Sequence, residues 1–191
     1  MKPGDVTLKS SRNVWWKCTK CGYEWHALIS SRANGNGCPA CSNRTVWAGH
    51  NDLATVNPSL AREWHPTKND SITPDCVTRG SKRKVWWLCQ KCGYEWQASV
   101  KDRNQSGKCP ACIGKALWKG HNDLATVNPS LAREWHPSLN GEITADSVLP
   151  GSNYRAWWLC PVCGHEWQAA LYNRSKGSGC PACYKNRRGR R

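Results

Sequence analysis

The sequence repeats itself with a fixed period of 71 residues. Two C-x-x-C pairs, separated by 16 residues, recur in register in three successive copies. An identical segment, GHNDLATVNPSLAREWHP, occupies residues 49–66 and 120–137. Self-similarity of this kind is typical of several copies of one small unit rather than one large core. We therefore expect three cysteine modules joined by two identical connectors, and within these 191 residues the first module is preceded by no connector.

The cysteine spacing predicts a metal site in every module. Two C-x-x-C turns supply four thiolates, and Zn²⁺ binds four thiolates in a tetrahedron at about 2.3 Å. Because protein would fill all four positions, the metal is expected to be structural rather than catalytic. A module this small should draw much of its folding free energy from zinc. The predicted ligands of the three Zn²⁺ ions are Cys18, Cys21, Cys38, Cys41, Cys89, Cys92, Cys109, Cys112, Cys160, Cys163, Cys180 and Cys183.

Disulfides and an iron–sulfur cluster are the alternatives for these cysteines. No secretory signal is visible at the N-terminus, which disfavours disulfides. Iron–sulfur clusters share the ligands, but a short, closed, basic module is more typical of structural zinc. The thirteenth cysteine, Cys76, aligns with Ser147 one repeat later, so it is not expected to be a ligand. We expect it to be a small, partly buried residue.

The residues around the cysteines predict a small zinc-stabilised α+β fold, a tandem array of three zinc-ribbon or treble-clef modules. Residues 85–89 and 93–100 are rich in Trp, Val and Tyr and should form a hairpin around the first knuckle. The sequence Asn57-Pro58 predicts a helix start, with the helix running through Trp64, and residues 129–135 should form its counterpart. The CPAC pair should open either a short helix or a second knuckle. The predicted domains are residues 1–48 (a partial repeat), 49–119, and 120–191 with a basic tail.

Tryptophan is the main large apolar residue, with 13 copies and no phenylalanine. One interpretation, which we favour, is that tryptophans form the small core of each module. The other is that they stack on bases of a single strand. Adjacent strand residues face opposite sides, so one member of each Trp-Trp pair could be more exposed than the other. The pairs are Trp15 and Trp16, Trp86 and Trp87, and Trp157 and Trp158.

Positive charge is concentrated in the modules. The chain carries 28 Lys and Arg against 13 Asp and Glu, a net charge of +15. Residues 1–48, 78–119 and 149–191 are strongly basic, whereas residues 49–77 and 120–148 are mildly acidic. Three zinc–thiolate sites would lower the net charge to about +9. Basic modules at regular spacing indicate a polyanionic partner, and the absence of a long apolar run argues against a membrane span.

Several residues between the hairpin and CPAC are candidate nucleic-acid contacts. One arginine recurs at the same place in every module, and it either contacts a phosphate or guanine edge or braces the loop. Neighbouring positions differ between modules and carry side chains able to bond base edges, although simple drift of loop residues is the alternative. Basic residues before each hairpin would contact phosphates. The candidates are Arg32, Arg103, Arg174, Ser31, Lys101, Asp102, Asn173, Asn34, Gln105, Lys176, Arg12, Lys82, Arg83, Lys84 and Arg155.

The repeated unit NDLATVNPSLAREWHP followed by W-W-x-C-x-x-C-G-x-E-W, R and CPAC resembles a known family, the repeated zinc-ribbon or treble-clef domain of bacterial and phage-related proteins. The resemblance covers essentially the whole chain. It implies a DNA-binding array with the twelve cysteines as zinc ligands. Some family members carry nuclease domains, for which this chain has no room. The expected function is sequence-selective binding of double-stranded DNA by a monomer, in a bacterial or phage-related cytoplasm and associated with the nucleoid.

Three alternatives remain open at this stage. The protein could bind RNA or single-stranded DNA through exposed tryptophans. It could be a protein-interaction scaffold, which would need exposed apolar faces on the connector helices. An enzyme is the least expected class: His50 and His121, in the sequence GHND, hint weakly at an HNH-like nuclease but lack further metal-binding partners. We expect no catalytic residues.

Overall fold

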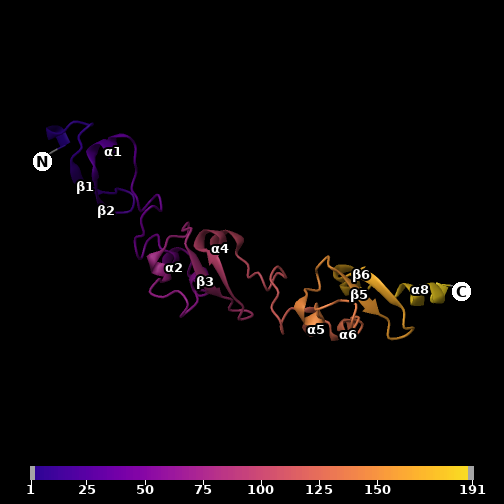
Figure 1. Ribbon diagram of the computed structural model, residues 1–191. Helices are drawn as coiled ribbons and strands as arrows, with labels where there is room; N and C mark the ends of the chain where they lie inside the picture. The colour runs from indigo at the N-terminus through magenta and orange to yellow at the C-terminus, as the bar shows by residue number, and fades with distance from the viewer. Residues whose placement is uncertain (1–2, 189–191) are drawn as a thin grey trace. The chain divides into compact units, whose positions relative to one another are not determined.

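The computed structural model describes residues 3–188 and divides into two compact units, Met1–Gly107 and Lys108–Arg191. Three antiparallel two-stranded hairpins recur along the chain (Figure 1). They share one register, in which the second tryptophan of each Trp-Trp pair lies opposite the tryptophan of the following strand. The strands are β1 (Asn13–Lys17) with β2 (Glu24–Leu28), β3 (Lys84–Leu88) with β4 (Glu95–Ser99), and β5 (Arg155–Leu159) with β6 (Glu166–Ala170).

A short helix follows each hairpin, where the sequence analysis expected a loop. In the second module the Ser99 hydroxyl accepts a hydrogen bond from the Asp102 N–H, which caps the helix start. Gly107 takes a positive φ of 63° and ends the same helix. The candidate base-reading positions therefore lie on or beside helices. These helices are α1 (Ile29–Ala33), α4 (Val100–Ser106) and α7 (Leu171–Ser175).

Each connector forms two four-residue helices instead of the single helix predicted. The Asp52 carboxylate accepts from the Thr55 N–H and starts the first helix. Asn57 lies outside the helical region, with φ −147° and ψ 71°, and its side chain caps the second helix. The prediction that this helix runs to Trp64 was wrong, because the chain leaves the helix to pair with β3. The helices are α2 (Leu53–Val56), α3 (Pro58–Ala61), α5 (Leu124–Val127) and α6 (Pro129–Ala132).

The remaining helical segments are short 3₁₀ turns and a C-terminal helix. In the third module the helix begins at the proline of CPAC, whereas in the first and second modules the same motif forms turns. The sequence left a short helix and a second knuckle open for CPAC, and the structure has a helix in the third module and turns in the other two. The segments are η1 (Pro3–Asp5), η2 (Pro74–Cys76), η3 (Ala145–Ser147) and α8 (Pro181–Arg188).

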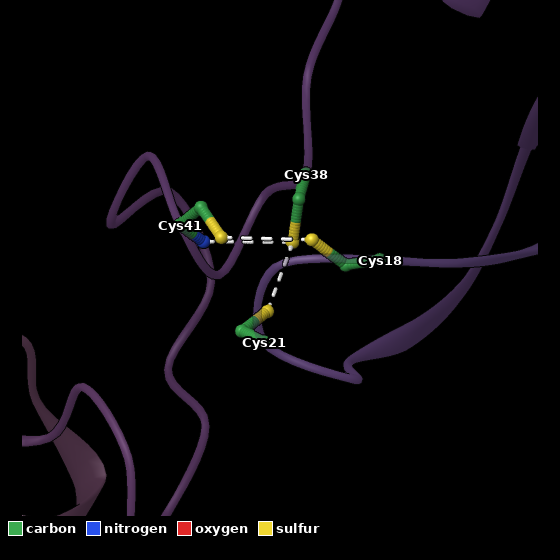
Figure 2. Close-up of side chains that lie close together, drawn as sticks. All are labelled: Cys18, Cys21, Cys38 and Cys41. Atoms are coloured by element: carbon green, nitrogen blue, oxygen red, sulfur yellow. Dashed lines mark hydrogen bonds between the residues drawn. The ribbon is translucent and has the colours of Figure 1, made fainter.

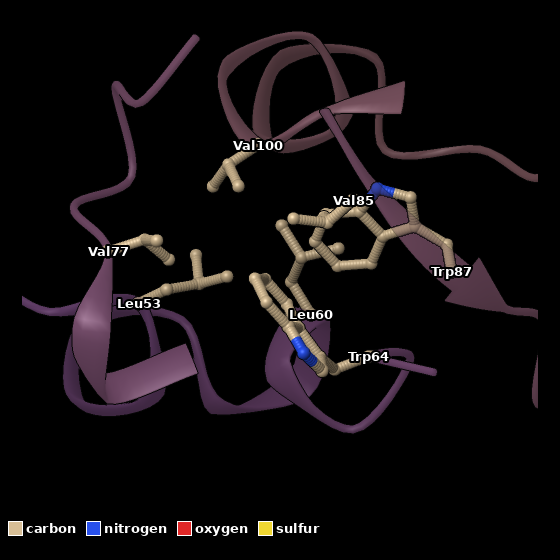
Figure 3. Packing of buried hydrophobic residues seen from close by; sticks show 7 residues of the cluster. All are labelled: Leu53, Leu60, Trp64, Val77, Val85, Trp87 and Val100. Atoms are coloured by element: carbon tan, nitrogen blue, oxygen red, sulfur yellow. The ribbon is translucent and has the colours of Figure 1, made fainter. Parts of the chain in front are cut away.

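Tryptophan and aliphatic side chains form a buried cluster around the second hairpin (Figure 3). Trp64 from the connector packs edge-on against Trp87 of β3, with ring centroids 5.3 Å apart. Trp87 is fully buried, as is its equivalent Trp158 in the second unit. The core interpretation is confirmed for these two residues and wrong for Trp15, which is 73% exposed. The cluster comprises Leu53, Leu60, Trp64, Val77, Val85, Trp87 and Val100.

The connector also pairs with the outer edge of β3, through an isolated antiparallel bridge between Trp64 and Trp87. The N–H of His65 donates to the carbonyl of Trp86, and the N–H of Leu88 donates to the carbonyl of Glu63. The side chain of Asn69 completes the pairing, since it accepts from the N–H of Trp86 and donates to the Trp86 carbonyl. The second unit repeats these bonds with the connector residues 134–140 on β5. The edge of each of these hairpins is thereby covered.

Among residues 3–188, every helix is too short or too polar to cross a lipid bilayer.

Candidate metal centres and nucleic-acid interface

The twelve predicted ligands gather into three groups of four sulfurs. Within each group the Sγ atoms all lie within 4.8 Å of one another. In the first group the four thiols point toward a common centre (Figure 2). The Sγ atoms of Cys18 and Cys41 are 3.7 Å apart, as are those of Cys21 and Cys38. The corresponding distances in the third group are 3.7 and 3.6 Å.

These distances fit zinc and exclude disulfides. A tetrahedron with Zn–S bonds of about 2.3 Å has edges of about 3.8 Å, which is close to the separations found. A disulfide would need about 2.05 Å, and all thirteen cysteines are free. The chain thus carries three structural four-cysteine zinc sites, as predicted. Cys76 lies outside them and is exposed, so the expectation that it is partly buried was wrong.

Backbone N–H groups close the turn of the first knuckle and stabilise a thiolate in it. Gly22 has φ +81°, and its N–H donates to the carbonyl of Cys18, which closes the turn. The backbone N–H groups of Cys21 and Lys20 lower the pKa of the Cys18 thiol to about 6. By contrast, the neighbouring thiols of Cys21 and Cys18 raise the pKa of Cys41 to about 12. Four thiolates therefore need a divalent cation to coexist at neutral pH.

The GHND segment of the connector supports the preceding CPAC turn. The Asn51 amide donates to the carbonyls of Ala40 and Thr45, and its oxygen accepts from the N–H of Trp47. The His50 ring stacks on Trp47 with centroids 3.5 Å apart. Since Asp52 caps α2, the three polar side chains of this motif all have structural contacts. Asn122 and His121 repeat the arrangement in the second unit.

The recurrent arginine braces its module in two of the three copies. The guanidinium of Arg103 forms an ion pair with Glu63 and lies over the rings of Trp87 and Trp96. Arg103 is only 3% exposed, which leaves no access for a phosphate. Arg174 is 5% exposed and makes the same contacts with Glu134 and its own tryptophans. Bracing, one of the two roles left open by the sequence, is the role that these contacts favour for both residues.

Arg32 occupies the equivalent place in the first module but is half-buried. It lies over Trp16 and Trp25, and it donates to the carbonyl of Asn36. No carboxylate among residues 3–188 forms an ion pair with it.

The structure brings the basic segment before each hairpin next to the helix after it. In the second module the N–H groups of Val100 and Lys101 donate to the carbonyls of Arg83 and Ser81. The first module has the same two bonds from Ile29 and Ser30, and the third from Leu171 and Tyr172. We call this surface the basic face of each module. Its exposed candidates are Arg12 and Asn34; Lys82, Arg83, Lys84, Lys101, Asp102 and Gln105; and Arg155, Asn173 and Lys176.

Two of the candidates form hydrogen bonds with neighbouring side chains. Ser31 is half-buried, and its hydroxyl accepts a hydrogen bond from the Asn36 amide. Asp102, although exposed, accepts from the Ser99 hydroxyl. In the basic tail, Lys185 and Arg188 are exposed at the end of α8. Arg190 and Arg191 lie outside the described residues.

Sequence reasoning missed Glu63 and Glu134, the partners of the buried arginines. The signal that could have found them is the constant offset of 40 residues between glutamate and arginine in both copies.

The chain was compared with known proteins. A family model described as a probable treble clef zinc finger domain matches three segments, residues 1–44, 60–121 and 131–186. The second and third matches begin inside the connectors. No curated protein matches the chain. The matched segments make up well over half of the sequence and contain all three cysteine groups, so the chain belongs to the family of probable treble clef zinc finger domains.

Proposed function

We propose that the protein binds double-stranded DNA, and does so with sequence preference, through the basic faces of its three zinc modules. The observation that carries the proposal is the pairing of two stretches far apart in sequence. A basic stretch, such as Lys82–Lys84, lies against a helix whose exposed positions differ between modules. Lysine and arginine side chains supply phosphate contacts, and variable polar side chains supply base contacts.

Charge supports a nucleic acid as the partner. The excess of basic residues persists after three zinc–thiolate sites are counted, at about +9. The basic residues lie in the modules, and the connectors between them are mildly acidic. An electrostatic footprint at three regular positions suits a long polyanion better than a small anionic ligand.

Single-strand binding is less well supported. Stacking would need exposed rings at Trp15, Trp86 and Trp157, yet only Trp15 is largely exposed, at 73%. Trp86 is half-buried beneath the ammonium of Lys68. A protein scaffold built on the connectors is also disfavoured, because Leu60 and Trp64 are buried in the module core. We propose a binding role without catalysis, exercised by a monomer in the cytoplasm.

The test is selection from a random duplex library by the zinc-loaded protein, with single-stranded DNA and RNA as competitors. Enrichment of one motif, retained against both competitors, is expected. The double variant Lys82→Gln/Arg83→Gln should weaken duplex binding and reduce the slope of log K against log salt by about 2.

The matched control removes two charges from the connectors instead. Arg62 and Arg133 are both exposed, and Arg62→Gln/Arg133→Gln should leave the salt slope unchanged. An affinity independent of salt, or equal losses in the two double variants, would refute the proposal. Binding without an enriched motif would remove the sequence preference and leave a general polyanion binder.

A further inference from the structure

Within residues 3–188, no segment pairs with the outer edge of the first hairpin, whereas the connectors pair with the outer edges of the other two. In the second module the segment from Leu60 to Asn69 fills the core with Trp64 and pairs with the outer edge of β3. In the third module residues 131–140 do the same on β5.

The surface that such a segment would cover is open in the first module. Trp15 is 73% exposed, whereas the equivalent Trp86 is half-buried. Trp16 is half-buried, whereas its equivalent Trp87 is fully buried. Within residues 3–188, no hydrogen bond reaches the Trp15 N–H and carbonyl on the side that Asn69 and His65 occupy in the second module. Among the described residues, the outer edge of strand β1 therefore presents the unpaired N–H and carbonyl of Trp15 beside the exposed ring of the same residue.

The charged side chains at this surface are complementary to those of a connector segment. In the second module the Nε2 of His65 lies 3.1 Å from the Glu95 carboxylate, and its Nδ1 accepts from the backbone N–H groups of Thr67 and Lys68. The equivalent of Glu95 in the first module is Glu24, whose ion-pair partner is the exposed Lys17. Arg32, the equivalent of Arg103, has the tryptophan contacts of its counterparts but no carboxylate partner among residues 3–188.

The occupant must come from outside these 191 residues. The chain has three modules and two connectors, and each connector is already paired with the module that follows it. A connector taken from a second copy of the chain would uncover that copy's own module. A segment of connector sequence that is not already paired with a module can fill the site without uncovering another module.

We propose that the first module is a docking site for a polypeptide segment of connector sequence, with the pattern L-x-x-E-W-H-P-x-x-N. The segment would add a strand to β1 and place its tryptophan against Trp16. Its glutamate would pair with Arg32, and its histidine would lie beside the Glu24 carboxylate. The inference is independent of nucleic-acid binding.

A labelled peptide provides the first test. The probe is the 14-residue peptide with the sequence of residues 57–70, titrated into the zinc-loaded full chain and followed by fluorescence anisotropy. We expect one site per chain, and a peptide carrying Glu63→Gln and Trp64→Ala should not bind. Glu24→Gln in the protein should weaken binding roughly tenfold. Glu166→Gln, at the equivalent place in the third module, should not, because its connector is attached.

A fused connector provides a test that does not depend on peptide affinity. Residues 49–71 are joined before Met1, and hydrogen exchange of residues 13–17 is compared with that of the original chain. We expect at least roughly tenfold slower exchange when the edge is paired, and loss of peptide binding. Unchanged exchange in the fused chain would overturn the proposal. Protection of residues 13–17 by single-stranded DNA but not by the peptide would also overturn it, as would a dimer that shields them without peptide.

Discussion

The buried guanidinium of Arg103 connects three parts of the second module. It lies between Trp87 of β3 and Trp96 of β4, and it pairs with Glu63 of the connector. A charge at 3% exposure is costly unless it is paired. The same side chain thus holds the connector on both strands of the hairpin.

Replacement of this arginine should destabilise the module strongly. Arg103→Met leaves the Glu63 carboxylate, which is 24% exposed, without its partner. We expect a loss of about 3 kcal/mol in the free energy of unfolding, measured by hydrogen exchange of β3 and β4. Arg32→Met is the matched control, and because Arg32 is half-buried without a carboxylate it should cost less than half as much. Equal losses would contradict the bracing role.

The buried carboxylate of Asp52 should stabilise the connector at neutral pH. Burial alone would raise the pKa of Asp52, but hydrogen bonds from the N–H and hydroxyl of Thr55 and from the Gly49 N–H outweigh it, and the pKa is lowered. A lowered folded pKa gives stability that is present above the ordinary value near 4 and is lost as the pH falls through the folded value. Asp52→Asn places an NH₂ donor where the second carboxylate oxygen accepts from the Gly49 N–H and the Thr55 hydroxyl. We therefore expect a cost of about 1–2 kcal/mol, to the same extent at every pH between 6 and 8. Denaturant unfolding across that range measures it, and a cost that vanished by pH 6 would contradict the assignment.

At the scale of elements, the second and third modules each consist of a hairpin packed against a connector and a following helix. The connector covers one edge, and the following helix packs its first residue into the core, as Val100 does at the start of α4. Helices of four to seven residues are marginal alone, so caps and packing must hold them. Asn57 and Asp52 provide such caps by accepting from backbone N–H groups.

The end of α4 provides a prediction about backbone conformation. Gly107 has φ +63° and its N–H donates to the Arg103 carbonyl, whereas Gly80 lies outside the positive-φ region. Neither glycine has an atom within 4 Å of an added Cβ. Gly107→Ala should therefore lose about 1 kcal/mol through backbone strain alone. Gly80→Ala should be neutral or slightly stabilising, and thermal unfolding compares the two variants. Equal melting temperatures would contradict the role of the left-handed cap.

The sequence was informative where the signal was local. The C-x-x-C pairs, the hairpin tryptophans and the Asn-Pro cap each lie within a few residues, and they predicted the zinc ligands, the strands and the start of α3. The connector was misjudged because Asn57 was taken as the only start signal, although Asp52 before Leu-Ala-Thr-Val is an equally good cap. Six of the seven residues of α4 are polar and the helix lacks apolar periodicity, so the packing of Val100 and the Ser99 cap, rather than the pattern, make it helical.

Side-chain roles that depend on distant partners could not be predicted in this way. Arg103 recurs within a basic module, and the sequence left open whether it contacts nucleic acid or braces the loop. Its partner lies 40 residues earlier in sequence, and only the fold brings the two together. By the same logic Trp15 and Trp86 lie in similar V-W-W sequences but differ in exposure, since within residues 3–188 a connector pairs only with Trp86.

At the scale of the whole molecule, the three modules differ in what supports them besides zinc. The second and third have buried clusters that include a connector leucine and a fully buried tryptophan. Around the first hairpin and its CPAC turn, the buried side chains are Ile29, Cys38 and Ala40. Metal binding contributes on the order of 10 kcal/mol in small zinc modules. The first module should depend on it most.

Zinc stoichiometry should follow the cysteine groups alone. The full chain should bind three Zn²⁺ ions, and Cys18→Ser/Cys21→Ser should bind two, measured by elemental analysis of the purified protein. Cys76→Ser is the control, because this exposed thiol belongs to none of the groups, and three ions should remain. A loss of zinc in the Cys76 variant would contradict the assignment of ligands.

Stepwise removal of the metal should then unfold the modules in a defined order. As a chelator is added to the zinc-loaded chain, hydrogen exchange should accelerate first in residues 13–28, before the equivalent residues 84–99 and 155–170. The reason is that the first module loses its main source of stability, whereas the other two retain packed tryptophans and the pairing of a connector with the hairpin edge. If the open edge of β1 is the cause, a connector fused before Met1 should slow the hydrogen exchange of residues 13–28 to the rate of the equivalent residues in the other two modules. Simultaneous loss of all three modules in the original chain would instead mean that zinc affinity, and not the apolar support of each module, sets the order.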